Sequence, residues 1–425
     1  MSEWKEHRLN ELADVIMGQS PPSSSYNEDN IGLPFLQGCA EFGETTPIVK
    51  YHCSAPKKIA PKNSILISVR APVGLTNIAD REFVIGRGLA SIVPTNSDLK
   101  FLLYAIKQNV LKLDAVSQGS TFLAINTDEL NKFKLDAPKL PEQRNIANIL
   151  STCDAVIEKT QSAIAKYKAI KQGILHDLFT RGIDLNTGKL RLKYEDAPTL
   201  YKESKLGMVP KEWGVASFEN SGVEIIDGDR GVNYPKEQDF IEAGYCLFLS
   251  ATNVSKDGFK FVAKQFITKE KDDLLGTGKL KREDIIVTTR GTVGNVVFYS
   301  NEVPYENIRI NSGMIILRNG DAQIKNLFLY HFVKEYLFEI YYKLAMSGSA
   351  QPQLPIKDFK KFPLVYPNAN EQDLITERLT SINKKLHTEQ TYLHKLQSIK
   401  QGLMADLLSG KKRVKLPEEA GMVYK

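Results

Sequence analysis

The chain has 425 residues, of which 42% are hydrophobic and 25% are charged. This composition is typical of folded globular proteins and excludes a disordered, collagen-like or disulfide-scaffold chain, and the length predicts more than one domain. The 56 basic and 50 acidic residues leave a net charge of +6, which permits a polyanionic partner without requiring one. Four scattered cysteines and the lack of a long apolar stretch predict reduced thiols, no membrane contact and a cytoplasmic location.

A long internal repeat is the most informative feature of the sequence. Glu142-Gln143 recurs as Glu371-Gln372, and Ile170–Gly173 recurs as Ile399–Gly402 at the same offset. The earlier parts of the two halves align more loosely, with small insertions of the kind that fall in loops. Each half is therefore predicted to contain a variable globular module followed by a uniform segment.

In chain order, residues 1–140 form the first predicted module. Runs rich in β-branched residues predict strands at Ile65–Val69 and Ser91–Val93, and apolar residues at helical spacing predict a helix over Leu99–Val110. Residues 141–182 are predicted to form a long helix. The polar stretch 183–211 is predicted to link the two halves.

Residues 212–367 form the second predicted module, with strands at Asp284–Thr289 and Met314–Leu317 and a helix over Ile324–Leu344. A second long helix is predicted over residues 368–411, followed by a tail over 412–425. The short strands and few helices predict an α+β fold in both modules. If a pseudo-two-fold axis relates the halves, two α/β modules are separated by two long helices that form an antiparallel coiled coil.

Both long segments carry an apolar stripe in steps of three and four residues, which is typical of a heptad seam. The simplest way to bury two matching stripes is to pack the helices on each other. The alternative is that each helix buries its stripe against its own module. The residues predicted to pair the helices are Ile146, Leu150, Ile157, Ile164, Ile174, Leu178, Ile375, Leu379, Leu386, Leu393, Leu403 and Leu407.

Loops at the ends of the predicted strands are rich in residue types that hydrogen-bond to phosphates or base edges. For any single loop, ordinary turn chemistry is the alternative. Arg70 and Arg290 occupy equivalent positions in the two modules, and each arginine either contacts DNA or forms an ion pair. The residues predicted to contact DNA are Gln19, Ser20, Ser23, Arg70, Gly74, Arg87, Gln118, Ser120, Thr121, Arg230, Asn233, Arg290, Thr292, Asn295, Arg309, Asn311, Ser347, Ser349, Gln351 and Gln353.

Motifs for catalysis or for a bound metal are missing from the sequence. The six histidines have no zinc-ligand spacing, and His52-Cys53 with Cys39 is a weak metal pattern. The segment Gly276–Leu280 is similar to a phosphate-binding loop but lacks the first glycine and the Ser/Thr that such loops use. We therefore predict that the chain has no catalytic residue, no metal site and no cofactor of its own.

Two variable modules, each followed by a near-identical long helix, resemble the specificity (S) subunits of type I DNA restriction-modification systems. The resemblance covers nearly the whole chain, and its motifs are Leu140–Ala147, Lys171–Leu175 and Gly207–Trp213. The second copy departs from the pattern, because Asn370 replaces the proline before Glu371-Gln372. In that family each module is a target-recognition domain that reads one half of a split, asymmetric DNA site, and the two helices, its conserved regions, space the half-sites.

The resemblance also implies the partners of the chain. They are double-stranded DNA, two methyltransferase (M) subunits that use S-adenosylmethionine to methylate adenine, and endonuclease/translocase (R) subunits. S-adenosylmethionine, ATP and Mg would belong to these partners, and the chain itself would be a non-catalytic specificity subunit. Two other classes stay open: an assembly scaffold without DNA contact, and a self-sufficient DNA nuclease or methyltransferase.

Overall fold

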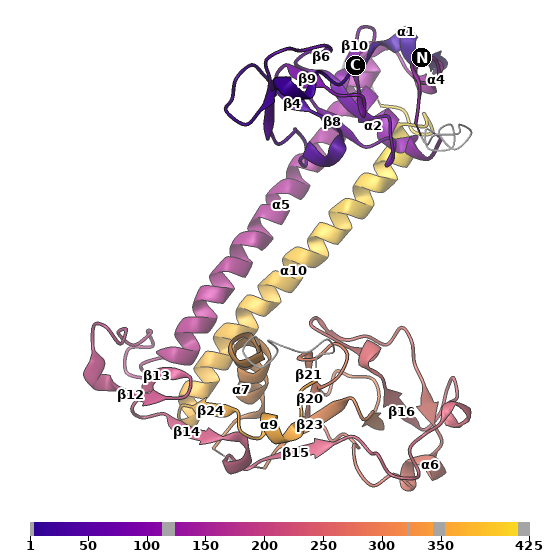
Figure 1. Cartoon of the computed structure of the whole chain (residues 1–425). Coiled ribbons are helices and arrows are strands. Elements are labelled where there is room, and N and C mark those ends of the chain that lie inside the picture. The colour runs from indigo at the N-terminus through magenta and orange to yellow at the C-terminus, as the bar shows by residue number, and fades with distance from the viewer. Residues whose placement is uncertain (1–3, 113–123, 321–322, 343–352, 415–425) are drawn as a thin grey trace, which may run out of the picture. The chain divides into compact units, whose positions relative to one another are not determined.

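The computed structural model describes residues 4–112, 124–320, 323–342 and 353–414 (Figure 1). The chain divides into two compact units, one made of Met1–Ala163 with Glu389–Lys425 and the other of Ile164–Thr388. Each unit contains one module and parts of both long helices. Helices and mostly antiparallel sheets occur in both units, which confirms the predicted α+β class.

The first module is built from a four-stranded sheet of order β2-β10-β7-β8, a five-stranded sheet of order β3-β5-β4-β9-β6, and the strand pair β1-β11. Its strands are β1 (Lys5–Arg8), β2 (Ala13–Met17), β3 (Tyr26–Asn27), β4 (Leu33–Leu36), β5 (Tyr51–Cys53), β6 (Ile59–Ala60), β7 (Ile65–Ser68), β8 (Thr76–Ile78), β9 (Phe83–Ile85), β10 (Leu89–Pro94) and β11 (Lys134–Ala137). Its helices are α1 (Leu9–Leu12), α2 (Leu99–Gln108) and α4 (Thr127–Asn131), with short 3-10 turns η1 (Ser23–Ser25) and η2 (Cys39–Glu41).

The second unit begins its own fold with the hairpin β12 (Tyr201–Ser204) and β13 (Gly207–Pro210). Its other strands are β14 (Gly214–Ser217), β15 (Val223–Asp227), β16 (Cys246–Leu249), β17 (Val254–Ser255), β18 (Gly258–Phe259), β19 (Phe266–Ile267), β20 (Ile285–Thr288), β21 (Val296–Phe298), β22 (Ile308–Ile310), β23 (Met314–Asn319) and β24 (Pro363–Tyr366). Its short helical elements are η3 (Pro198–Leu200), η4 (Phe218–Asn220), η5 (Glu237–Asp239), η6 (Ala251–Asn253), α6 (Lys269–Asp273), α7 (Asn326–His331), the π-helical η7 (Phe332–Tyr342) and α9 (Ile356–Phe359).

The two modules share their sheet topology. The order β15-β23-β20-β21 repeats β2-β10-β7-β8, and the pair β14-β24 repeats β1-β11. In both modules one parallel pairing occurs at the same place, between β4 and β9 in the first and between β16 and β22 in the second. The repeat read from the sequence is therefore a repeat of the fold.

The central strand of each shared sheet explains why those runs of sequence form strands. In β10, Leu89, Ala90 and Ile92 are buried, and the strand pairs on one side with β2 and on the other with β7. In β23, Met314–Leu317 is fully buried between β15 and β20. Continuous apolar runs are the pattern expected of strands that are covered on both faces.

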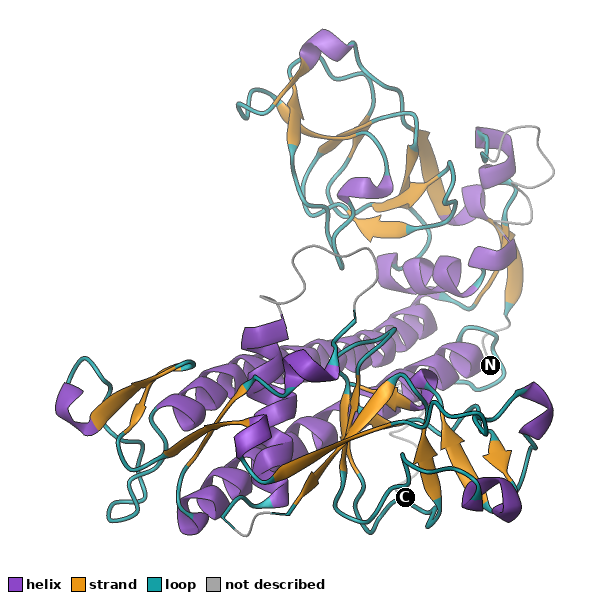
Figure 2. Cartoon of the chain, turned by 60° about the horizontal axis from the view of Figure 1, so that its bottom comes forward, coloured by secondary structure: helices purple, strands orange, loops and turns teal. Residues whose placement is uncertain are grey.

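The two long helices, α5 (Leu140–Thr180) and α10 (Ala369–Leu407), run antiparallel within each unit (Figures 1 and 2). In the first unit Asp154 of α5 forms an ion pair with Lys400 of α10, at 2.5 Å between Oδ1 and Nζ. In the second unit the ammonium of Lys385 lies 4.6 Å from the ring centroid of Tyr167. Partners are thus later in α10 where they are earlier in α5, which confirms the predicted antiparallel coiled-coil helices.

The residues predicted to pair the helices are all buried or partly buried. One apolar cluster joins Ile146, Leu150, Leu403 and Leu407 with the first module, and another joins Ile174, Leu178, Ile375 and Leu379 with the second. Ile164 and Leu386 are 7% and 8% exposed, and Ile157 and Leu393 are partly buried. At its ends the stripe is therefore buried by the partner helix and by the module together. Helix-on-helix packing and packing on the module, the two alternatives considered from the sequence, both occur there.

Most local predictions hold, and the linker is the main difference. The predicted strands appear as β7, β10, β20 and β23 and the first short helix as α2, whereas the second is split into α7 and the π-helical η7. The polar stretch 183–211 contains the β12–β13 hairpin, whose Tyr201 and Val209 are 4% and 0% exposed. Its few apolar residues are spaced to bury against the second module, which turns the expected linker into a folded part of that unit.

Candidate nucleic-acid interface

The same turn follows β7 in the first module and β20 in the second. The Ser68 hydroxyl accepts a hydrogen bond from the Leu75 N–H at 2.9 Å and donates one to the Pro72 carbonyl at 2.7 Å. The Thr288 hydroxyl accepts from the Asn295 N–H at 3.0 Å and donates to the Thr292 carbonyl. A buried hydroxyl therefore shapes both turns, and each turn presents an exposed arginine at its first position, Arg70 or Arg290.

In the first module this turn lies beside two other loops. We call Gln19, Ser20, Gln37, Arg70 and Arg87 the first loop cluster. The Ser20 hydroxyl accepts from Gln37 Nε2 at 3.2 Å and from the Arg87 backbone N–H at 3.3 Å. Loops that are far apart in the sequence therefore meet at one place.

Backbone contacts fix the other two members of the first loop cluster. The Gln19 N–H donates to the Ile85 carbonyl at 3.0 Å, at the end of β9. The Val69 N–H donates to the Gly88 carbonyl at 3.0 Å, which places Arg70 next to the turn that carries Arg87. Because these bonds involve the backbone, the side chains of Gln19, Arg70 and Arg87 remain exposed.

Close backbone packing requires glycine at one equivalent position in each module. A Cβ at Gly18 would lie 2.2 Å from the Gly86 carbonyl oxygen, and a Cβ at Gly228 would lie 2.1 Å from the Asn311 carbonyl oxygen. Both distances are far below contact, so any side chain would separate the loops. Gly18 directly follows β2 and Gly228 directly follows the equivalent strand β15, so the two glycines hold the same loops together.

In the second module we call Asp227, Arg230, Arg290, Asn311 and Gln353 the second loop cluster. The Arg230 guanidinium donates to the Asp227 carboxylate at 3.2 Å and to the Ser312 carbonyl at 3.1 Å. The Arg290 N–H donates to the Gly313 carbonyl at 3.2 Å, and Arg290 forms an isolated bridge with Gln353. The side chain of Asn311 accepts from the Gly313 N–H at 2.9 Å.

Three of the four arginines of these clusters are exposed without an ion pair among the described residues. Among the residues that the structure describes, no acidic group pairs with Arg70, Arg87 or Arg290, and all three arginines are exposed. This favours the DNA-contact interpretation of Arg70 and Arg290 over the ion-pair alternative. Arg230 is different, because Asp227 neutralises part of its charge.

Arg309 belongs to the interior of the second module rather than to its surface. It is 5% exposed, and its guanidinium binds the Asp272 carboxylate together with the carbonyls of Thr277, Asp272 and Leu275. Its donors are therefore taken up by the protein. The position was predicted to contact DNA because an arginine without a counterpart suits base reading, but burial gives it a structural role.

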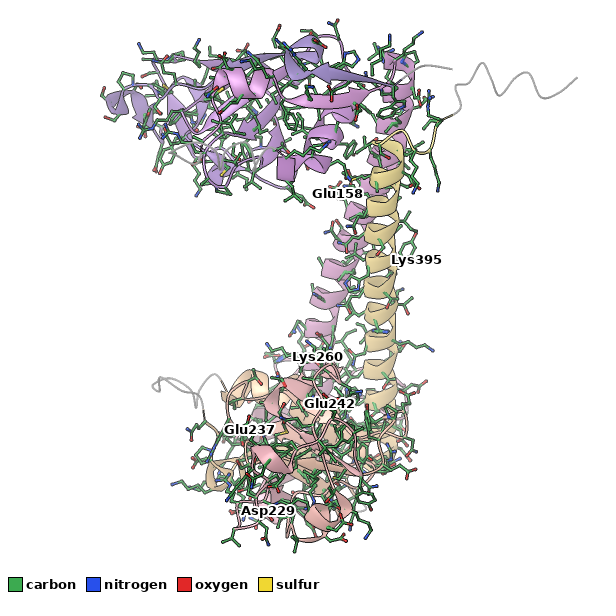
Figure 3. The ribbon with its side chains drawn as sticks, turned by 90° about the vertical axis from the view of Figure 1, so that its right-hand side faces the viewer. Glu158, Asp229, Glu237, Glu242, Lys260 and Lys395 are labelled. Atoms are coloured by element: carbon green, nitrogen blue, oxygen red, sulfur yellow. The ribbon has the colours of Figure 1, made fainter. Side chains whose placement is uncertain are left out.

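The glycine-containing segment that is similar to a phosphate loop surrounds a carboxylate instead. The Asp229 carboxylate, labelled in Figure 3, accepts from the N–H groups of Gly231 and Gly276 at 2.7 Å and of Thr277 at 3.3 Å. Burial raises the pKa of Asp229, but these N–H donors outweigh burial and lower the pKa below its ordinary value. The N–H groups of this segment are therefore already bound by a carboxylate of the same module, that of the residue before Arg230.

Five of the remaining predicted positions lie within the described residues. Asn295 Nδ2 donates to the Val254 carbonyl at 3.0 Å, and Asn233 Nδ2 donates to the Leu274 carbonyl at 3.3 Å, so both amides join loops of the module. Gly74 is buried with φ +84°, whereas Ser23 and Thr292 are exposed. Six further predicted positions lie outside the described residues: Gln118, Ser120, Thr121, Ser347, Ser349 and Gln351.

Sequence reasoning missed two members of the clusters. Gln37 directly follows β4, and Asp227 ends β15. Neither residue belongs to the loop segments that the sequence singled out, so only their position directly at a strand end could have indicated them. Over the described part of the chain, no group of three His, Cys, Asp or Glu residues is placed to hold a metal ion, and no described helix could cross a bilayer.

Comparison with known proteins gives the same assignment to both halves. Residues 1–166 and 216–398 match the family of the type I restriction modification DNA specificity domain. The type I restriction enzyme MjaIX specificity subunit of Methanocaldococcus jannaschii is 23% identical over 427 residues, which cover 97% of this chain and 94% of the relative. A proposed MjaX specificity subunit of the same organism is 40% identical over 181 residues, 42% of this chain and 41% of that relative.

The fold has also been seen in a solved structure. The crystal structure of the type I restriction-modification system S subunit from M. genitalium matches with a TM-score of 0.60 over 96% of both chains, at 19% sequence identity. Because the family match covers both modules and most of both long helices, the chain belongs to the specificity subunits of type I restriction-modification systems.

Proposed function

We propose that this chain reads a bipartite, asymmetric site in double-stranded DNA, with one module for each half-site. The observation that carries the proposal is the pair of loop clusters: the same turn and the same exposed arginine stand among different polar side chains. A shared scaffold with unshared side chains suits two readers of two different sequences.

The two kinds of residue suggest two kinds of contact. Arg70 and Arg290 occupy the same position in both modules, which suits docking on phosphates that every DNA sequence has. Gln37 and Arg87 in the first cluster and Asn311 in the second have no common type. Amide and guanidinium groups of this sort discriminate base edges in the major groove.

We further propose that the long helices dock two M subunits and that R subunits join the complex. Glu158 on α5 and Lys395 on α10 are exposed charged residues on these helices (Figure 3). Ile170 and Ile399, at equivalent positions of the repeat, are 40% and 45% exposed. Exposed apolar side chains between charged ones suit a protein interface.

In this proposal the chain itself is not a catalyst and acts in the cytoplasm. Adenine methylation with S-adenosylmethionine and cleavage with ATP and Mg²⁺ belong to the M and R subunits. The loop clusters offer hydrogen-bond donors and acceptors for recognition.

The proposal is tested by expressing the chain with its M subunit in cells and sequencing the methylated adenines. We expect methylation at one bipartite motif with a fixed gap. Exchange of residues 1–140 for the first module of another specificity subunit should change one half of the motif and leave the other half unchanged.

Three outcomes would contradict it. Methylation without sequence preference would remove the reading function. A complex whose DNA affinity is absent or does not fall with salt would indicate an assembly scaffold, since phosphate contacts make binding salt-dependent. Methylation or cleavage by the purified chain alone would indicate an enzyme.

A further inference from the structure

Both long helices begin with the same buried pair of side chains. Glu142 and Gln143 of α5 are each 2% exposed, and Glu371 and Gln372 of α10 are each 0% exposed. Consecutive residues of a helix point about 100° apart, because a turn takes about 3.6 residues. The glutamate and the glutamine of each pair can therefore hold two different parts of the unit.

In the first unit the glutamine binds the module. Gln143 accepts from the Ser97 hydroxyl at 2.8 Å and from the Asp98 N–H at 2.9 Å, and it donates to the Pro138 carbonyl at 2.9 Å. Asp98 is the N-cap of α2. The buried amide thus makes three hydrogen bonds, two to the segment that enters α2 and one to the segment that enters α5.

In the second unit the equivalent glutamine makes equivalent bonds. Gln372 accepts from the Lys325 N–H at 2.7 Å and donates to the carbonyls of Gln323 and Pro367 at 2.7 and 2.8 Å. Lys325 is the N-cap of α7, as Asp98 is of α2. Although the modules have diverged, this attachment is the same in both.

The glutamates bind the end of the other helix. Glu142 accepts from Arg413 Nε and Nη2, both at 2.8 Å. Glu371 accepts from both terminal nitrogens of Arg191 and from the Ile183 N–H at 2.8 Å. In each unit the glutamate therefore joins the start of one long helix to the residues that follow the other. This ion pair holds the backbone that carries the adjoining glutamine.

A single strand connects each glutamine to a loop cluster. Strand β10 runs from the turn that carries Arg87 to the segment that carries Ser97 and Asp98. Strand β23 runs in the same way from the turn of Asn311 toward Lys325. Both strands are six residues long, roughly 20 Å, and each is hydrogen-bonded to a neighbour on both sides. A change in the tilt of either strand at the glutamine end would therefore displace the loop cluster at its other end.

We propose that Gln143 and Gln372 are positioning residues for DNA reading, and that each sets the orientation of the loop cluster of its own module alone. The proposal rests on the DNA-reading function proposed above. It assigns half-site fidelity to two residues that touch no DNA, because each anchors the central strand whose far end carries the reading turn.

The test uses Gln143→Met and Gln372→Met in the full chain, in complex with the M subunit. The side chain keeps its length but loses its hydrogen bonds, and Gln161→Met, at an exposed position of α5, is the matched control. Methylation is measured on DNA libraries randomised in one half-site at a time. We expect Gln372→Met to lower base discrimination about tenfold, the effect of losing a hydrogen bond, in the half-site of the second module only. Gln143→Met should do the same for the other half-site.

A further measurement separates positioning from general damage. Hydrogen exchange of the Lys325 N–H should accelerate in Gln372→Met while that of the Asp98 N–H is unchanged, and the reverse should hold for Gln143→Met.

Equal loss in both half-sites, or unchanged discrimination with faster exchange, would overturn the inference. If the parent complex itself methylates without a bipartite motif, it is the proposed function that fails, so the two failures are distinguishable.

Discussion

The two modules have the same scaffold but differ in how they fill one matching position of it. In the parallel strand pair of the first module, Val84 lies opposite Phe35, whereas in the second module Arg309 lies opposite Phe248. Val84 is 0% exposed in a small apolar cluster, and Arg309 is 5% exposed and paired with Asp272.

This difference teaches which part of the fold is fixed. The strand order and the turn after β7 or β20 are kept, while the part of the module next to the loop clusters is filled either by apolar packing or by a charge network. A buried charge needs a partner for every donor, so Arg309 depends on α6 and on the segment after it. Val84 needs only shape-matched neighbours, and the first module has a five-stranded sheet there instead.

The sharpest way to break the comparison is Asp272→Ala, which leaves the Arg309 guanidinium buried without its carboxylate. We expect the second unit to lose about 3–5 kcal/mol of unfolding free energy, the usual result of breaking a buried ion pair. Urea unfolding measures this loss, with Trp213 as the reporter of the second unit in a Trp4→Phe background.

The control for this prediction moves the second module toward the chemistry of the first. Asp272→Leu with Arg309→Val replaces the pair by apolar side chains, as at Val84. It should cost less than Asp272→Ala, because no charge is left buried and only the carbonyls that Arg309 bound lose their donors. A double variant as unstable as Asp272→Ala would show that the network does more than compensate for its own burial.

The glutamates at the helix starts give the next largest effect. Glu371 is fully buried and its partner Arg191 is 12% exposed at the side chain, whereas the partner of Glu142, Arg413, is 41% exposed. We expect Glu371→Gln to cost about 2–4 kcal/mol and Glu142→Gln about 1–2 kcal/mol, because an exposed guanidinium regains water when its partner is neutralised. Unfolding followed by Trp213 for the first variant and by Trp4 for the second compares them, and equal losses would contradict the prediction.

Substitutions in the loop clusters compare shared with unshared arginines. Arg70→Gln and Arg290→Gln should weaken DNA binding by the complex on all sequences and reduce the salt slope by about one, as expected for a phosphate contact. Arg87→Gln should cost about 1–3 kcal/mol and relax one base position in the half-site of the first module. Binding measured at several salt concentrations, on matched and mismatched DNA, separates the two. Relaxed base preference in Arg70→Gln would reverse the roles.

The smallest expected effect is a dependence on pH that is stronger in the second unit. Burial raises the pKa of Asp272, but hydrogen bonds from Lys279 and Arg309 outweigh burial and lower it, and the pKa of Asp229 is lowered by its N–H donors. A carboxyl whose folded pKa lies below the unfolded value of about 3.9 stabilises the fold above that pH. The contribution is lost as the pH falls from there through the folded pKa. Acid titration followed by Trp213 should be flattened in Asp229→Asn, and an unchanged curve would contradict the prediction.

Much of the fold could be predicted from the sequence because its signals are local or periodic. Heptad steps gave both helices, and apolar runs such as Ile65–Val69 gave the central strands. The β12–β13 hairpin was missed, because polar composition hides the few apolar residues that bury it. The π-helical part after α7 was also not predicted, since its apolar spacing is that of an ordinary helix.

The candidate site could be predicted only in outline. The repeat indicated Arg70 and Arg290, and the structure places both among exposed polar loops. The repeat could not show that Arg309 is buried, because its burial depends on Asp272, which lies far away in the sequence. Nor could it indicate Gln37, whose place beside Ser20 and Arg87 arises from loops that meet only in the folded chain.

The discontinuity of the first unit has a consequence during synthesis. A Cβ at Gly410 would lie 3.0 Å from the ring of Trp4, and Leu407 and Leu408 complete the apolar cluster that contains Leu9. During translation, the first unit therefore has an uncovered apolar face until Glu389–Lys425 is synthesised, which happens only after all of the second unit. We expect this nascent chain to need a chaperone, and the second unit to reach its native state first.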